Sequence, residues 1–344
     1  MLARIRPDQP RPARPPSPPP TRPQPPPSSQ PDWVARYRSA SLLYADAAAV
    51  AQPKQQHLMP EVGNGFVAAK AHGRPSKLGD YLMVGGVYNG RADSGDKELD
   101  GPSHRAQIPS FLPSVEGASA ATASAHTALD MERAAFITRG TVGSGVAVEQ
   151  RLYAHWTRPH LLVQEFHLAS SAPGEVSFTA PKDEALWSSG IDFSGTTLSP
   201  PKPGLRIVTG STRISETATS NTTLVAMVST APAPVRLRAG GNTTVFVLHA
   251  VSTSLNGSTE PSQVLAEAMG YHAAGVSAAP QLWQEHTAAW QERWADGRIE
   301  VGGDLALAQS VNASLYFLLS AIREDWPFGL SPGGLASSDY FGHV

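Results

Sequence analysis

The chain has 344 residues, of which 41% are hydrophobic and 16% charged, and its formal net charge is −2. This length suits about two domains, and the small net charge gives no electrostatic basis for binding nucleic acid or an acidic membrane surface. The absence of cysteine excludes disulfides, thiolate metal sites and cysteine nucleophiles. No apolar run approaches the ~20 residues of a membrane span. We therefore expect no nucleic-acid partner and no membrane span.

Residues 1–38 are predicted to be a disordered, proline-rich tail. The first 31 residues contain thirteen of the 31 prolines, interleaved with Arg and Ser, and such a segment buries too little apolar surface to fold. Its PxxP runs suit an SH3-type groove, and its Arg and Ser bias resembles an organelle transit peptide. The favoured interpretation is a low-complexity tail without a role in the chemistry.

The segment from about Leu42 to Ser254 has the pattern of short strands. Apolar and polar side chains alternate along 146–152 with a period of two. Further strand-like runs lie at 161–168, 176–178, 205–208, 224–228, 235–237 and 245–251. Turn sequences rich in Gly, Pro and Asn separate them, and no helical period intervenes. This pattern predicts an antiparallel β-sandwich, which we place at residues 39–257.

The hydrophobic period becomes helical after the sandwich. Linker helices are predicted within 258–300, one beginning near Pro261 and one from about Pro280 to Trp294. Asp304 is the expected N-cap of a third helix. Its apolar stripe consists of Leu305, Ala308, Val311, Leu315, Leu318, Leu319 and Ile322. Such a broad stripe needs partners that the chain does not supply, which indicates missing structure beside it.

Several motifs occur in a recognisable order. They are Gly63-Asn64-Gly65, residues 85–90, residues 104–109, Trp283 with Trp290 and Trp294, residues 309–316, and residues 327–335. In this order they resemble glycoside hydrolase family 65, and the last is most similar to its acid-trehalase-like branch. The resemblance implies a mainly β fold: an N-terminal antiparallel sandwich of the galactose-mutarotase-like super-sandwich type, then a helical linker. The truncated start of an (α/α)₆ barrel would follow at 301–344.

The resemblance also implies a glycosidase that cleaves α-glucosyl linkages with inversion, such as those of trehalose-like disaccharides or glucosylgalactosyl-hydroxylysine. Inversion needs two carboxyl groups about 6.5–9.5 Å apart, one protonated and one ionised. In the family both lie further along the barrel than Val344, so we expect no catalytic residue here and no activity from this chain alone. Glu324, Asp325 and Asp339 are the only local carboxylates that we weigh as substitutes, and solvated surface positions are favoured for the first two.

Tyr340, Gly342 and His343 are the residues predicted to bind substrate. The resemblance places them at the sugar pocket, aromatic faces stack on sugar rings, and imidazole hydrogen-bonds hydroxyl groups. Ordinary loop packing is an equally simple interpretation.

Two other groups of residues have simpler explanations. Trp283, Trp290 and Trp294 share one helix face, and burial against the neighbouring domain is favoured over a sugar-stacking platform. No cofactor and no metal are expected, since His155, His160 and His167 lie on strands without paired acids.

Alternatives stay open for function and compartment. The absence of a catalytic pair also suits a non-catalytic module that binds carbohydrate or a partner protein, and some family members are disaccharide phosphorylases. The lack of an apolar signal sequence favours the cytoplasm. N-glycosylation sequons suit the secretory pathway or vacuole; they begin at Asn221, Asn242, Asn256 and Asn312. The oligomeric state cannot be read from the sequence.

Overall fold

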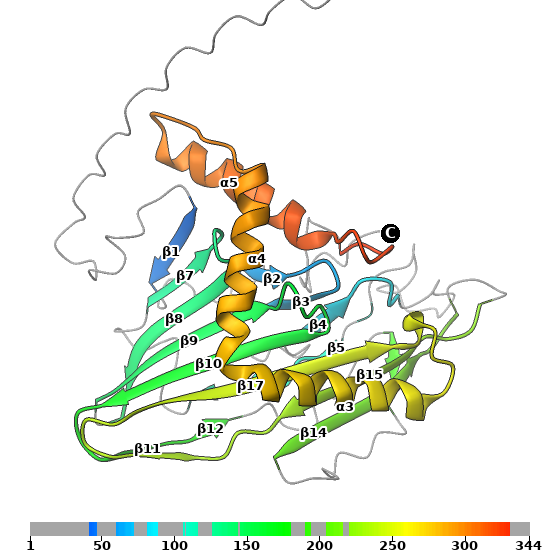
Figure 1. Ribbon diagram of the computed structural model, residues 1–344, viewed down its shortest axis with the longest axis horizontal. Helices are drawn as coiled ribbons and strands as arrows, with labels where there is room; N and C mark the ends of the chain where they lie inside the picture. Colours follow the sequence, from blue (N-terminus) through cyan, green and yellow to red (C-terminus); the bar gives the residue numbers. More distant parts are fainter. Residues whose placement is uncertain are drawn as a thin grey trace, which may run out of the picture. The chain divides into compact units, whose positions relative to one another are not determined.

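The computed structural model describes residues 41–46, 60–71, 81–88, 106, 108–115, 126–143, 145–179, 190–193, 204–215 and 220–330. The chain divides into two units, Met1–Arg38 and Ser39–Val344, and all described residues belong to the second. The tail predicted at 1–38 therefore lies outside the described residues. Figure 1 shows the second unit as sheets with helices on one side.

The described strands form antiparallel ladders. The largest sheet has nine strands in the order β1 (Leu42–Asp46), β7 (His126–Asp130), β8 (Ala135–Val142), β9 (Val146–Ala154), β10 (Leu161–Ser170), β17 (Asn242–Thr253), β15 (Leu224–Thr230), β14 (Leu205–Thr212) and β13 (Ile191–Asp192). A four-stranded sheet consists of β2 (Glu61–Gly63), β3 (Val67–Lys70), β4 (Tyr81–Val84) and β5 (Ile108–Pro109). Two short ladders pair β11 (Gly174–Val176) with β16 (Val235–Leu237), and β12 (Phe178–Thr179) with β6 (Ser114–Val115).

The four-stranded sheet packs against the inner face of the nine-stranded one. Val62, Phe66 and Leu82 of the small sheet share a buried cluster with Leu152 and Leu162 of the large sheet. The expected alternation along 146–152 is observed, because even-numbered apolar residues of β9 are buried and odd-numbered ones are more exposed. The predicted mainly β fold with an antiparallel sandwich is confirmed.

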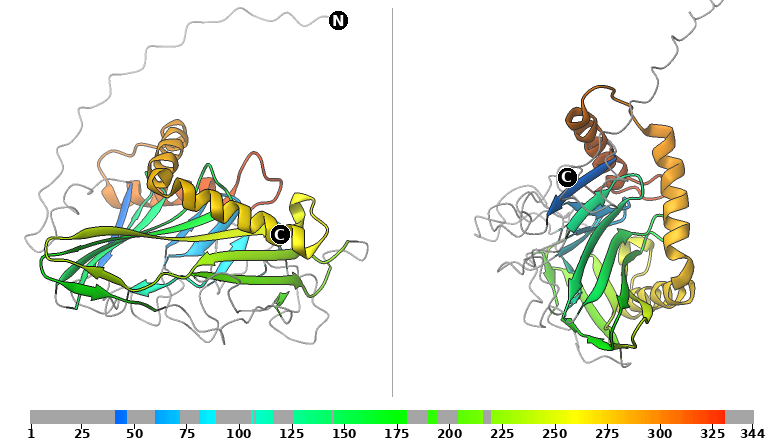
Figure 2. Two further views of the ribbon diagram at one scale, coloured as in Figure 1. Left: turned by 60° about the horizontal axis from the view of Figure 1, so that its bottom comes forward. Right: turned by 90° about the vertical axis from the view of Figure 1, so that its left-hand side faces the viewer.

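Two helices cover the outer face of the nine-stranded sheet: α3 (Pro261–Ala278) and α4 (Leu282–Gly297), as Figures 1 and 2 show. Short 3₁₀ turns precede each of them, η3 (Ser254–Asn256) and η4 (Ala279–Gln281). A Cβ on Gly275 of α3 would lie 2.8 Å from a methyl carbon of Leu161, so the absence of a side chain lets α3 approach the sheet closely. In the described part of the chain, no helix has the length and apolar character to cross a membrane.

The tryptophans of α4 are packing residues. Trp290 and Trp294 are buried in the main core, and the Trp290 indole N–H donates to the Met131 carbonyl oxygen at 2.8 Å. Trp283 is half-buried and meets Tyr153 edge-on, with ring centroids 5.3 Å apart. The packing interpretation is confirmed for Trp290 and Trp294.

The third helix, α5 (Leu305–Ala321), begins as predicted, because the Asp304 carboxylate accepts from the Leu307 N–H at 3.0 Å. The buried face differs in part from the predicted stripe. Ala308 of the stripe is buried, and Leu315 and Leu319 are partly buried against the core, but Leu305, Leu307, Leu318 and Ile322 are 47–54% exposed. The buried residues are Ala308, Asn312, Tyr316, Ser320 and Ala321. Small and polar side chains let the helix lie close to the sandwich, which hydropathy alone does not reveal.

Candidate functional site

Three of the sequence motifs meet at one place on the sandwich. The residues after α5, 322–330, which we call the exit segment, lie against two glycine-containing turns at 63–66 and 85–86, which we call the seat. The Leu330 N–H donates to the Ala321 carbonyl oxygen at 2.7 Å, so the exit segment folds back on the end of α5. Figure 1 shows it beyond the C-terminal end of α5, close to β2–β4.

Asn64 organises the first turn of the seat. Its side chain is fully buried, and its amide nitrogen donates to the carbonyl oxygens of His155 and Pro159, both at 2.9 Å. Its side-chain oxygen accepts from the N–H groups of Phe66 at 2.9 Å and Val67 at 2.8 Å. Both donor and both acceptor positions of the amide are therefore used. This turn is fixed to the β9–β10 connection by hydrogen bonds.

Gly65 allows the close approach of α5. Its φ is +82°, and a Cβ there would lie 2.5 Å from the Ile322 backbone carbon. Its N–H donates to the Ser320 carbonyl oxygen at 2.7 Å. Only glycine satisfies both the backbone conformation and the space.

Arg323 connects the exit segment to the seat. Its side chain is 9% exposed, and one terminal nitrogen donates to the carbonyl oxygens of Asn64 at 3.1 Å and Trp156 at 2.9 Å. The rest of the guanidinium makes a two-point contact with the Asp325 carboxylate, at 2.7 and 3.0 Å. The guanidinium carbon lies 5.0 Å from the centroid of the Trp156 ring.

Aromatic residues complete the contact with the second turn. The Trp326 indole N–H donates to the Gly85 carbonyl oxygen at 2.9 Å, and its ring lies edge-on to Phe66 at 4.8 Å. Phe328 covers Gly86, where φ is +90° and a Cβ would lie 2.6 Å from the Phe328 ring. The exit segment thus has one well-defined path up to Leu330, which is 1% exposed.

The predicted substrate-binding residues Tyr340, Gly342 and His343 lie outside the described residues, as does Asp339. They stay predictions. The structure does describe the segment that leads to them, which ends in the buried Leu330.

The two described carboxylates that we weighed as substitutes are on the surface. Glu324 is exposed, and the Asp325 side chain is 65% exposed. The Arg323 hydrogen bond lowers the pKa of Asp325, which outweighs the opposing effect of partial burial. A lowered pKa is the opposite of what a general acid needs at neutral pH. The solvated interpretation agrees with this geometry.

Two histidines attach α4 to the sandwich. His155 accepts from the Arg158 N–H at 3.2 Å, and its other nitrogen lies 3.0 Å from the Leu282 carbonyl oxygen. His286 accepts from the Trp156 N–H at 3.1 Å, with its other nitrogen 2.9 Å from the Arg133 carbonyl oxygen. Burial lowers the pKa of His155 to about 4 and that of His286 to about 3. Both rings are therefore neutral structural connectors.

His167 differs from the prediction, because it does have a paired acid. One imidazole nitrogen lies 3.1 Å from a Glu165 carboxylate oxygen. The prediction was wrong, because Glu165 and His167 are two apart on β10 and therefore share a face of the sheet.

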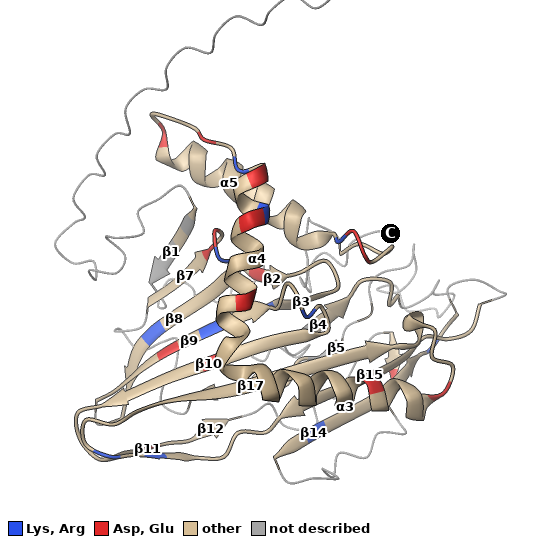
Figure 3. Cartoon of the chain, viewed as in Figure 1, with Lys and Arg blue, Asp and Glu red and all other residues tan. Residues whose placement is uncertain are grey.

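A polar network on the outer sheet face was also missed. Glu149 and Arg151 of β9 lie opposite His167 and Glu165 of β10, and Arg139 of β8 lies opposite Glu149. Figure 3 shows these basic and acidic positions side by side on β8 and β9. The i, i+2 spacing of the charges was visible in the sequence, but the pairing register was not.

Known proteins support the resemblance noted in the sequence. No family model matches the chain. The chain is 31% identical to the protein-glucosylgalactosylhydroxylysine glucosidase of Dictyostelium discoideum over 317 residues, which are 90% of the chain and 42% of that protein. It is 28% identical to the Mus musculus protein of the same name over 305 residues, 85% of the chain and 41% of that protein. A kojibiose hydrolase of Mucilaginibacter mallensis is 40% identical over 63 residues, 18% of the chain and 9% of that protein.

Among solved structures, a candidate kojibiose phosphorylase from the human microbiome is similar with a TM-score of 0.61 and 10% identity, over 82% of this chain and 42% of that one. At this identity the likeness shows the fold alone. The chain spans about two fifths of the length of the curated glucosidases that it matches. The relatives in sequence and the fold both support the resemblance to glycoside hydrolase family 65: the chain is similar in sequence to protein-glucosylgalactosylhydroxylysine glucosidases, and its fold is similar to that of the kojibiose phosphorylase.

Proposed function

We propose that this chain is the sandwich-bearing part of a glycosidase that hydrolyses an α-glucosyl linkage with inversion. In this proposal, residues 39–257 are the sandwich, 258–300 the linker and 301–344 the start of the catalytic barrel. Residues 331–344 contribute Tyr340, Gly342 and His343 to the sugar pocket.

The contact between the exit segment and the seat is the observation that supports this most directly. Arg323, Asn64 and Trp326 join segments that are more than 240 positions apart. The carbonyl oxygens and glycines involved allow little variation in the path of the backbone. A rigid approach of this kind suits a loop whose next residues must be held in position against a ligand.

The curated relatives support the reaction class, since those that match over most of the chain are named as glucosidases. Glucose attached to galactosyl-hydroxylysine is the first substrate to test, and kojibiose and trehalose follow. The resemblance implies that both catalytic carboxylates lie further along the barrel than Val344, so the 344-residue chain alone should release no glucose.

The test begins with the transcript read through the codon for Val344. We expect the frame to continue into an aromatic-Trp-Asp motif and further helices, and the longer product to release β-glucose from an α-glucosyl substrate, as proton NMR of the first turnovers would show. A stop codon directly after Val344, together with no release of glucose, would overturn the proposal. Repeating the assay with inorganic phosphate separates hydrolysis from phosphorolysis, because a phosphorylase would form glucose 1-phosphate.

A further inference from the structure

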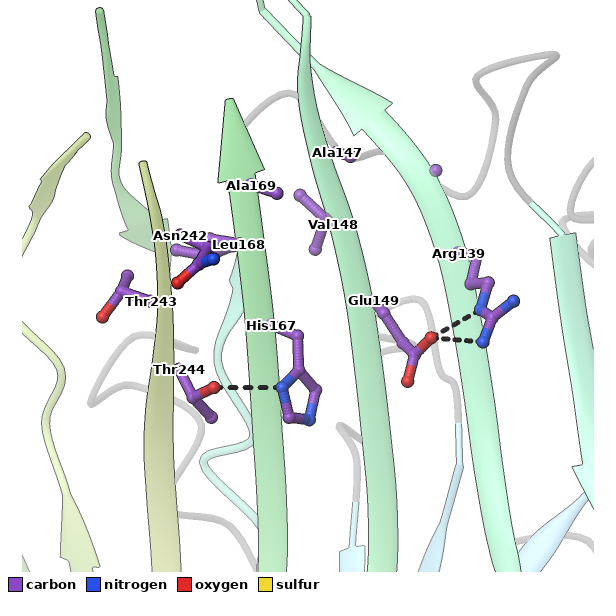
Figure 4. A pocket seen from close by; sticks show the side chains of 11 residues that line it. Arg139, Ala147, Val148, Glu149, His167, Leu168, Ala169, Asn242, Thr243 and Thr244 are labelled. Carbon is purple, nitrogen blue, oxygen red and sulfur yellow. Dashed lines mark hydrogen bonds and ion pairs between the residues drawn. The ribbon is translucent and has the colours of Figure 1, made fainter. Parts of the chain in front are cut away.

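A pocket of about 420 Å³ opens on the outer face of the nine-stranded sheet (Figure 4). Residues of β8, β9, β10 and β17 line it. Ala147 and Ala169 are directly paired across β9 and β10, and both are exposed. Because larger side chains surround these two methyl groups, the sheet face is hollowed there. The volume lies within the usual range of sites for small molecules.

On one side of the pocket, two arginines form ion pairs with one glutamate. An Arg139 nitrogen lies 2.6 Å from one oxygen of the Glu149 carboxylate, and an Arg151 nitrogen lies 2.7 Å from the other. Burial disfavours the charged form of Glu149, but the two guanidinium groups outweigh it and lower its pKa. Glu149 is therefore an anion whose orientation is fixed from both sides, as Figure 4 shows for Arg139.

His167 is held equally firmly beside it. One imidazole nitrogen lies 3.0 Å from the Thr244 hydroxyl, and the other lies 3.1 Å from the Glu165 carboxylate. Glu165 is 1% exposed, and its carboxylate also accepts a hydrogen bond from the Tyr153 hydroxyl at 2.5 Å. Desolvating such a carboxylate is costly unless its partners are well placed. The side chains at the pocket are thus preorganised by a network that continues beneath them.

The charges of this network cancel. Arg139 and Arg151 balance Glu149 and Glu165, so the pocket has no net attraction for an ion. Asn242 and Thr244, which lie opposite Ala169 and His167, add an amide and a hydroxyl group on the opposite side. A ligand that suits these walls has many hydrogen-bonding groups, no charge, and one apolar face for the two alanines.

A salt-bridged, solvated sheet face is the simpler alternative. Exposed ion pairs contribute about 0–1 kcal/mol each. They give no reason for two paired alanines among larger neighbours. A binding site accounts for this hollow.

We propose that this pocket, which shares no residue with the seat, binds the ring of a neutral sugar without cleaving it. The hydroxyl groups of the sugar would meet Glu149, Arg139 and the Thr244 side, and one C–H face of the ring would cover Ala147 and Ala169. The proposal does not rest on the proposed glycosidase reaction, because it requires no catalytic group.

The test is an amide NMR titration of the 344-residue chain with maltose and with kojibiose. Saturable shift changes are expected at Gly140, Ala147, Ala169 and Thr243. Glucuronate, a charged sugar, should bind more weakly than the neutral sugars, because the guanidinium groups of Arg139 and Arg151 already pair with Glu149. If no neutral sugar gives saturable shifts, or if the shifts map to other residues, the proposal is wrong.

Two matched variants separate binding from folding. Ala147→Trp fills the hollow from an exposed position and should weaken binding by at least about tenfold. Arg236→Trp introduces the same ring at a position where the side chain is 88% exposed, and it should leave binding unchanged. Equal affinity of the two variants would overturn the proposal, provided that both give the amide spectrum of a folded chain. Glucose release by a longer product is measured separately, so either proposal can fail without the other.

Discussion

The guanidinium of Arg323 donates to the backbone carbonyl oxygen of Asn64 at 3.1 Å, across 259 positions of the chain. This bond joins the end of α5 to the first turn of the small sheet. The position of the exit segment therefore depends on an intact seat. A substitution in this turn should disturb residues 322–330 as well.

Gly65→Ala should be strongly destabilising. Its φ of +82° disfavours any side chain, and the added methyl group would meet the Ile322 backbone. We expect a loss of about 3 kcal/mol in the free energy of unfolding, measured in urea. Gly143→Ala is the matched control, because its φ of +53° is also positive but no atom lies within 4 Å of the new Cβ. It should cost about 1 kcal/mol. Equal losses would show that the contact with α5 contributes nothing.

Asn64→Asp tests the donors separately from the acceptors. The carboxylate keeps the bonds from the Phe66 and Val67 N–H groups, but it faces the carbonyl oxygens of His155 and Pro159 without a hydrogen to donate. We expect the variant to lose about 3 kcal/mol or more near neutral pH. Protonation of the new carboxyl restores a donor, so the loss relative to the parent should shrink in acid. A loss that is independent of pH would contradict this account.

The stability of the chain should fall as the pH decreases below about 6.5. Burial lowers the pKa of His155 to about 4 and that of His286 to about 3. At pH values between these folded-state pKa values and the ordinary histidine pKa, the unfolded state binds more protons than the folded state. Stability is therefore lost as the pH falls through this range. The expected loss is about 2 kcal/mol per histidine at about pH 5. Urea unfolding at several pH values measures it, and constant stability from about pH 7 to 5 would contradict it.

The two faces of α5 should differ in their tolerance of an introduced charge. Leu318→Glu changes a side chain that is 54% exposed, whereas Ala308→Glu changes one that is 1% exposed. The first should alter the free energy of unfolding by about 0.5 kcal/mol or less, as urea unfolding would show. The second should detach α5 from the sandwich and strongly lower the free energy of unfolding, because it places a charge in a buried position. Similar destabilisation by both would mean that the outer face of α5 is packed.

The local elements were predictable from sequence because their signals are local. The alternation along β9 and the Asp304 cap each depend on residues within a few positions of one another. The buried face of α5 was not predictable, since the inward side chains of Asn312 and Ser320 are polar and their burial depends on a sheet formed more than 200 residues earlier.

The candidate site was partly predictable. The Gly63-Asn64-Gly65 and 327–335 motifs were recognised, but only the fold brings the first turn against the exit segment. The Glu149 and His167 network depends on the register of β9 and β10, and a shift of one residue would separate its members. No pattern within a single strand contains that information.

The separation of Asn64 from Arg323 has a consequence for synthesis on the ribosome. At about 5–20 residues per second, roughly 10–50 s pass between translation of the turn and translation of its partner. Once His155 and Pro159 have been made, the turn has all four Asn64 side-chain bonds available, but it still has neither the Arg323 guanidinium nor the close cover of α5. Nascent chains arrested before Arg323 should therefore be cleaved by protease near Gly65, and chains long enough to release α5 should be protected.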